Sequence, residues 1–215
     1  MNNNELKTFL KEHEACKPAI RWVKKDNLNQ AWWRCNRADW MVWLLEIFVG
    51  TKNWPTSKQV VLVVCNCICH CLKADERTEE VMPYIKLIKR WASGSGGSSS
   101  RVVNADLLSE ISIPRDSWPS TRNLAYQPLI YIIKYILSKR NGSRVSGMDF
   151  LSKAICEAVD YKVAVNLENG KKRASSRTML EDMAIIIRGS FPSVPIRRSL
   201  PTENRLIAEI DRRLV

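Results

Sequence analysis

The cysteines are the residues of this sequence whose type and spacing could do chemistry. Four of the seven cysteines alternate with other residues over one short stretch, with a histidine between the last two: Cys65, Cys67, Cys69, His70 and Cys71. The apolar run 60–64 leads into them without a turn residue, so we expect one continuous helix. A free thiol packs as a small apolar side chain. The pattern therefore favours a buried helix whose thiols stay reduced.

Two other chemistries are open to this cysteine cluster. Thiols four residues apart share one face of a helix and could give two thiolates to a zinc ion, as Cys65 with Cys69 or Cys67 with Cys71. A structural zinc site takes four ligands, usually from two segments, and alternate thiols of one helix point to opposite faces, so we expect no metal site. A thiol nucleophile beside His70 needs a lowered thiol pKa and access to solvent, whereas the apolar neighbours indicate burial.

Other catalytic signatures are absent from the sequence. It has two histidines, His13 and His70. It has no glycine-rich nucleotide fingerprint, no G-x-x-x-x-G-K-S/T loop, no G-x-S-x-G elbow and no H-E-x-x-H pair. We therefore expect a protein that is not an enzyme and uses no cofactor.

The basic excess of the chain gives the candidate binding residues. The 215 residues include 34 Lys and Arg against 22 Asp and Glu, a formal net charge of +12, with a sequence pI near 9.5. Hydrophobic residues make up 45%, which is typical of a folded protein. The candidate partner-binding residues are Lys86, Lys89, Arg90, Lys139, Arg140, Arg144, Lys171, Lys172, Arg173, Arg177, Arg197 and Arg198.

Helical periodicity divides most of the chain into short elements. Apolar stripes predict helices within 6–10, 16–23, 28–35, 39–49, 56–72, 82–92, 104–111, 123–140, 150–159, 180–189 and 202–214. Residues 161–172 suit a loop or small hairpin because Asn169-Gly170 is a turn signal, and prolines favour an extended stretch after 190. No strand-type alternation is long enough for a sheet. The expected fold is all-α, with about eight to nine short helices in one bundle or two subdomains.

Capping residues support several of these helices. Asp39 is expected to cap the 39–49 helix, and Gly50 to end it in the left-handed conformation. Thr56 and Gln59 fit a capping box for the helix with the cysteines. Most of the eight tryptophans lie on apolar stripes, so Trp32, Trp40, Trp43 and Trp91 are expected in the core. Trp33, Trp54 and Trp118 are expected to be freer to face a partner.

A Ser- and Gly-rich stretch suggests how the chain is organised. We expect a helical domain at 1–92, a linker or loop at 93–103 and a basic helical region at 104–215. No apolar run approaches the ~20 residues that span a bilayer. The first residues show no secretory signal. The expected location is the cytoplasm, without membrane contact.

Residues 12–92 resemble a known domain. The resemblance is carried by Cys16-Lys17-Pro18-Ala19, Ala31-Trp32-x-x-Cys35, Ala38-Asp39-Trp40-Met41-x-Trp43-Leu44-Leu45 and Arg90-Trp91-Ala92. This series is similar to the immunity-protein helical domain of bacterial and phage genomes. The resemblance implies a protein that neutralises a toxin by binding it, or an anti-defence protein of a phage, and it brings no catalytic residues.

Two functions follow from these observations. The first is a non-enzymatic protein that recognises and blocks or scaffolds a macromolecular partner, with an acidic protein surface or a nucleic-acid-binding groove as its target. The alternative is direct binding of nucleic acid by the C-terminal basic clusters, because Lys and Arg contacts to phosphate dominate non-specific affinity.

Overall fold

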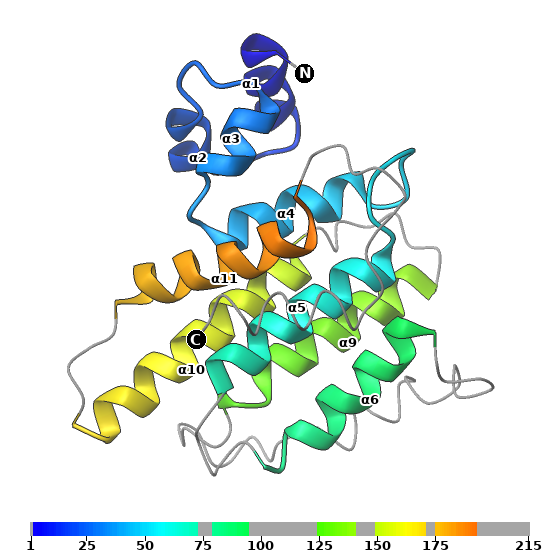
Figure 1. The fold of residues 1–215 in the computed structure, drawn as a ribbon, viewed down its shortest axis with the longest axis vertical. Coiled ribbons are helices and arrows are strands. Elements are labelled where there is room, and N and C mark those ends of the chain that lie inside the picture. The colour runs from blue at the N-terminus through cyan, green and yellow to red at the C-terminus, as the bar shows by residue number, and fades with distance from the viewer. Residues whose placement is uncertain (1, 73–78, 95–123, 141–148, 171–174, 193–215) are drawn as a thin grey trace.

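The computed structural model describes residues 2–72, 79–94, 124–140, 149–170 and 175–192 (Figure 1). Within these ranges all regular structure is helical, which confirms the all-α prediction. The helices are α1 (Asn3–Glu12), α2 (Lys17–Trp22), α3 (Leu28–Arg34), α4 (Ala38–Phe48), α5 (Ser57–Leu72), α6 (Met82–Ser93), α9 (Gln127–Arg140), α10 (Phe150–Glu168) and α11 (Ser176–Ser190). No helix of the described part is long and apolar enough to cross a membrane.

Helix α10, together with α5, lies at the centre of the bundle. It packs against α4, α5, α9 and α11, and α6 packs against the other side of α5 (Figure 1). The apolar side chains of α4, α5, α9, α10 and α11 belong to one hydrophobic core. Helices on both sides of the 93–103 stretch therefore contribute to the same core.

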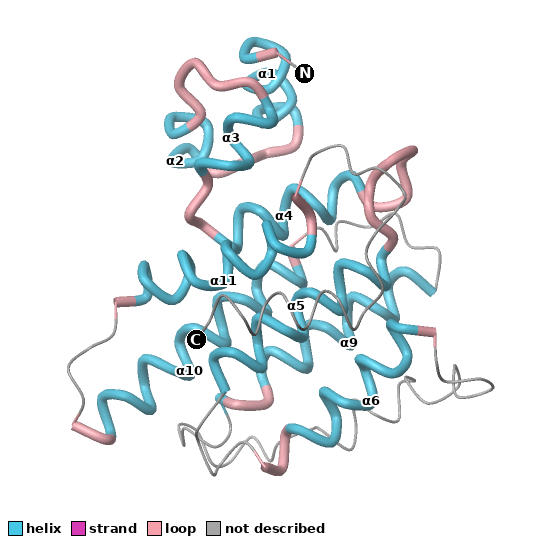
Figure 2. Tube along the Cα trace, in the orientation of Figure 1, coloured by secondary structure: helices cyan, strands magenta, loops and turns pink. Residues whose placement is uncertain are grey.

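Helices α1, α2 and α3 form a small cap at one end of the bundle, next to α4 (Figure 2). Three hydrogen bonds join α3 and the residues after it to α11. They run from Trp32 Nε1 to the Phe191 carbonyl (3.0 Å), from Asn36 Nδ2 to Glu181 Oε1 (2.9 Å) and from the Arg188 guanidinium to the Cys35 carbonyl. The Trp32 ring is fully buried, so its N–H needs this acceptor.

A row of stacked rings joins the cap to the far end of α4. Phe9 of α1 stacks between His13 and Phe48, with ring centroids 4.1 and 4.8 Å apart. Trp54 stacks on the other face of Phe48 at 4.0 Å. Trp54 is thus half-buried in an internal stack, which corrects the expectation that it is free to face a partner.

Two of the three predicted caps occur as expected. The Thr56 N–H donates to Gln59 Oε1 at 2.8 Å and the Gln59 N–H donates to Thr56 Oγ1 at 3.3 Å, which is the capping box of α5. Gly50 follows α4 with φ of 85°. Asp39 is different, because it lies inside the first turn of α4 and makes no capping bond. Its carboxylate instead accepts two hydrogen bonds from Arg37, at 2.9 and 2.6 Å.

The helix that begins at Phe150 is longer than predicted. Residues 161–168 continue α10 to Glu168, where a loop or hairpin was expected. Tyr161 and Val165 are buried and extend the apolar stripe of Ala154 and Ala158 by two more turns. The turn signal does act, but as the end of the helix, with Gly170 at φ of 62°. The predicted helices at 104–111 and 202–214 lie outside the described residues.

Glu46 connects α4 to the N-terminus of α10. Its carboxyl is buried and accepts the backbone N–H groups of Leu151 (3.0 Å) and Ser152 (3.4 Å). Asp149 precedes α10 but makes no side-chain capping bond, so Glu46 caps the helix from another element. Burial raises the pKa of the Glu46 carboxyl well above its ordinary value, and the two N–H bonds offset this only in part.

We expect Glu46→Ala to lower the free energy of unfolding by about 2–3 kcal/mol, because it leaves two helix-terminal N–H groups without an acceptor. Glu46→Gln keeps one amide oxygen and should cost about 1 kcal/mol. Because the native carboxyl holds its proton more tightly than the unfolded one, wild-type stability relative to Glu46→Gln should fall as pH rises above ~4.3. Urea denaturation at several pH values measures both effects.

The control is Glu12→Gln, which removes an exposed carboxylate at the end of α1. It should change stability by no more than about 0.5 kcal/mol. If Glu46→Ala and Glu12→Gln lower the free energy of unfolding equally, the hydrogen bonds of Glu46 to α10 do not stabilise the fold.

Candidate functional site

The thiols of the cysteine cluster lie inside the bundle. Cys65, Cys67 and Cys71 of α5 are buried, and the Cys67 thiol lies 3.8 Å from the Met183 carbonyl of α11. Burial raises the pKa of Cys65 and Cys67 well above the ordinary value, and that of Cys71 to about 12. Groups with such pKa values carry almost no thiolate at neutral pH, so they are poor nucleophiles.

Cys69 and His70 lie nearer the surface of α5. Cys69 is half-buried, and desolvation raises its pKa although the charge of Lys89 acts in the opposite direction. His70 faces α11, with Nε2 3.8 Å from Asp182 Oδ2. The two side chains thus have different neighbours. In the part of the chain that the structure describes, no three His, Cys, Asp or Glu residues are grouped as a metal site.

The structure places five of the twelve candidate basic side chains. Lys86 and Arg90 are exposed on α6, whereas Lys89 is half-buried against Cys69. Lys139 is exposed on α9, with Nζ 5.5 Å from the Tyr135 ring. Arg177 binds Glu181 at 2.9 Å on α11. The side chains of Arg140, Arg144, Lys171, Lys172, Arg173, Arg197 and Arg198 lie outside the described residues.

The charges are segregated among the helices. Neither α5, α6 nor α9 has an Asp or Glu residue, while α6 and α9 each have three Lys or Arg and α5 has Lys58. Lys58 extends to α6, with Nζ 5.3 Å from the Trp91 ring. We call Lys58, Lys86, Lys89 and Arg90 the α6 cationic face. Glu79 and Glu80 precede α6, at the opposite end from Arg90.

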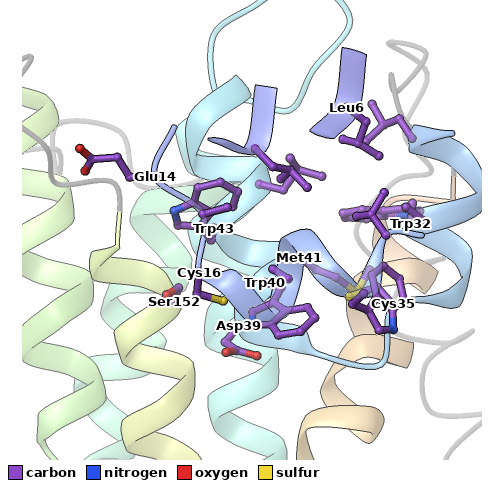
Figure 3. A pocket seen from close by; sticks show the side chains of 18 of the residues that line it. Leu6, Glu14, Cys16, Trp32, Cys35, Asp39, Trp40, Met41, Trp43 and Ser152 are labelled. Carbon is purple, nitrogen blue, oxygen red and sulfur yellow. The ribbon is translucent and has the colours of Figure 1, made fainter. Parts of the chain in front are cut away.

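A second site, which the sequence did not reveal, is a cavity of about 360 Å³ between the cap and α4 (Figure 3). Its walls come from α1, α2, α3, α4 and the start of α10. Most of its lining is apolar, and four of the eight tryptophans contribute to it. The main lining side chains are Leu6, Leu10, Trp22, Trp32, Trp40, Trp43 and Met41, with the thiols of Cys16 and Cys35.

Two arginines fix the tryptophans on one side of the cavity. Trp22 meets Trp40 edge to face, with centroids 6.1 Å apart. The Arg37 guanidinium lies 4.8 Å from the Trp40 ring, and Arg34 lies 5.7 Å from Trp22. Arg34 is in turn held by Asp26, at 2.5 Å. Each ring is therefore positioned by a cation that is itself paired with a carboxylate.

The polar residues of the cavity lie toward α10. Asp39 is buried and paired with Arg37. Asp149 is paired with Lys153 at 2.6 Å, and Ser152 adds a hydroxyl on the next turn of α10. Glu14, in the turn after α1, is exposed, and Figure 3 shows its carboxylate directed away from the tryptophans.

One signal in the sequence points toward this cavity. Helices α2 and α3 have six and seven residues, too few to bury several tryptophans among themselves. Trp32 is in the core as expected, but Trp40 and Trp43 are only half-buried and line the space between elements. Several tryptophans on or beside short helices thus indicate that these helices share an interface and do not fill it completely.

Comparison of the chain with protein-family models, with curated proteins and with solved structures finds no match. The similarity of residues 12–92 to immunity-protein helical domains therefore stays a prediction. The α6 cationic face and the tryptophan-lined cavity are the two candidate sites in the described part of the chain.

The thiols provide a direct test of these placements. We expect a thiol reagent at about pH 8 to modify Cys16 rapidly in the native protein, because Cys16 is exposed. Burial raises the pKa of Cys35 to about 11. Cys156 is exposed as well, but desolvation, and then the charge of Asp39, raise its pKa to about 12, so it should react more slowly than Cys16. The other thiols should react slowly, and all seven should react after unfolding.

The variant Cys16→Ser should remove the rapid phase and leave the slow phase unchanged. Rapid modification of Cys65, Cys67 or Cys71 in the native protein, located by peptide mass mapping, would contradict the buried positions.

Proposed function

We propose that the protein is a non-enzymatic binding protein that recognises a macromolecular partner through the α6 cationic face and blocks or scaffolds it. The observation that supports this best is the charge pattern of α5 and α6. Their four basic side chains occur without one acidic residue in either helix. An inhibitor of the immunity or anti-defence type would act in this way, because binding alone suffices for its effect.

The proposed partner surface is acidic. Complementary potentials accelerate encounter and fix orientation, and they do so most for charges within a Debye length, about 8 Å at physiological salt. Lys86 and Arg90 are one helical turn apart and both exposed, so one acidic patch could reach both. Trp91 is half-buried beside Lys58 and adds an aromatic surface of the kind enriched at interfaces.

The pKa values of the thiols support binding over catalysis by cysteine. A nucleophilic cysteine needs a depressed thiol pKa. Burial instead raises the pKa of Cys65, Cys67, Cys69 and Cys71. The remaining candidate for nucleophile activation, His70, faces Asp182 on α11.

The test reverses the charges of the α6 cationic face. Immobilised wild-type protein and Lys86→Glu/Arg90→Glu are compared in affinity capture from a lysate of the cells that produce the protein, at ~150 mM salt. We expect wild type to retain one protein at near-equal amounts, and the variant to retain at least about tenfold less, because repulsion replaces attraction. Quantitative mass spectrometry measures the recovered partner.

The matched control is Lys17→Glu/Arg21→Glu on α2. It has the same spacing of four residues, the same change of net charge and two exposed side chains. It should retain the partner like wild type. Equal loss in both variants would assign the effect to net charge, and no loss in either would contradict the α6 cationic face as the binding surface.

The alternative function is direct binding of nucleic acid. Fluorescence anisotropy of labelled DNA and RNA at low and ~150 mM salt tests this alternative, because phosphate contacts weaken steeply with salt. Tight binding that survives ~150 mM salt, and capture that disappears after nuclease treatment, would replace the protein partner with nucleic acid.

A further inference from the structure

The cavity between the cap and α4 has the size and the lining of a small-molecule site. Its volume of about 360 Å³ is near the lower end of the range of ligand pockets, about 300–1,000 Å³, which are mostly apolar with a few polar groups. It lies among helices of the cap and the bundle, and spaces between helices commonly hold such sites (Figure 3). The walls of an unfilled apolar space lack dispersion contacts, and an apolar molecule that fills the space provides them.

The carboxylates that line the cavity, among the described residues, offer no free negative charge to a ligand beside the rings. Asp39 is paired with Arg37, and Asp149 is paired with Lys153. The carboxylate of Glu14 is directed away from the tryptophans in Figure 3. A cation that entered the cavity would lose hydration and gain no unpaired counter-charge, which is costly.

Two of the tryptophan rings already bind cations of the protein itself. The Arg37 guanidinium lies 4.8 Å from the Trp40 ring, and the Arg34 guanidinium lies 5.7 Å from the Trp22 ring. The cation–π attraction of these two rings is therefore used within the protein. What the rings offer a ligand is apolar area, together with the offset or edge-to-face contacts that aromatic rings make with one another.

An anion finds no partner charge in the lining either. No Lys, Arg or His is among the described residues that line the cavity, and Lys17 and Arg21 of α2 are exposed and do not belong to its wall. The indole N–H groups of Trp22, Trp40 and Trp43 make no hydrogen bond to another described residue, so they are available as neutral donors. A neutral donor suits the carbonyl oxygen of an uncharged molecule, whereas a carboxylate would also lose hydration without a cation to compensate it.

We propose that this cavity binds a small uncharged molecule with an aromatic body. The aromatic body would lie among Trp32, Trp40 and Met41, and a single acceptor, such as a carbonyl oxygen, would take an indole N–H. The selectivity comes from the lining as a whole, whose aspartates are already paired and whose remaining surface is mostly apolar. The site is formed by helices other than α6 and does not depend on the proposed partner.

The test compares three probes that share a phenylethyl group. They are the uncharged ketone benzylacetone, the anion 3-phenylpropionate, which has nearly the same shape, and the cation 3-phenylpropylammonium. Each is titrated into the full chain by calorimetry, with ligand-observed NMR as a second readout. We expect saturable binding of the ketone at one site. Each ion should bind at least about tenfold more weakly, because it loses hydration without gaining a partner charge.

A second measurement places the probe in the cavity without changing the sequence. Cys16 is exposed and lines the cavity, whereas Cys156 is exposed on α10 and is not among the lining residues. Saturating benzylacetone should therefore suppress the rapid modification of Cys16 by a thiol reagent and leave the rate at Cys156 unchanged. Peptide mass mapping measures both rates.

A pair of variants locates the site independently. Ala19→Phe fills the cavity from α2 and should abolish binding of the ketone. Ala164→Phe is the matched control, because Ala164 is also half-buried but lies on α10 outside the cavity, and it should bind the ketone as wild type does. Circular dichroism and thermal unfolding show whether each variant keeps its fold.

The proposal is overturned if wild type shows no saturable binding of the ketone, if either ion binds as tightly as the ketone, or if folded Ala19→Phe binds the ketone as wild type does. Should Ala19→Phe fail to fold, unchanged rapid modification of Cys16 in wild type saturated with the ketone overturns it as well.

Discussion

The buried bond between Glu46 and the N-terminus of α10 fixes the relation between the early and late halves of the chain. Leu151 and Ser152, which donate to Glu46, are more than a hundred residues away in sequence. A helix N-terminus in a core must find acceptors for its free N–H groups. Glu46 meets that need from α4, so the first N–H groups of α10 lie against α4.

The position of α10 then determines the other packing. Helix α10 packs against α4 on one side and contacts α5, α9 and α11 on its other sides. The thiols of α5 become buried in this core, which raises their pKa values and removes the reactivity that their spacing suggests. The same bond places Asp149 and Ser152 beside the cap, where they form the polar side of the cavity. One capping interaction therefore shapes both the inert cluster and the candidate pocket.

The sequence predicted what depends on local pattern. The helices through Thr56, Pro83 and Leu180 follow from apolar periodicity and caps, and the structure has all three. Predictions that relied on the usual role of a single residue were wrong in two places. Asp39 pairs with Arg37 and does not cap α4. Asn169-Gly170 follows the end of α10, where the turn of a loop or hairpin was expected. The position of the cavity could not be predicted, because it arises where the consecutive helices α1 to α4 meet the start of α10, much later in the chain, and leave space unfilled.

The distribution of charge differs between the α6 cationic face and the cavity. A net charge of +12 would repel a small cation from a uniformly basic surface. Among the described helices, however, α2, α3, α5, α6 and α9 have Lys or Arg and no Asp or Glu, while α4 has only acidic charges, Asp39 and Glu46. At 0.15 M salt screening acts over about 8 Å, so each site responds mainly to the helices that form it. The α6 cationic face is thus built from helices with basic charges alone, whereas the cavity combines the acidic α4 with the basic α2 and α3.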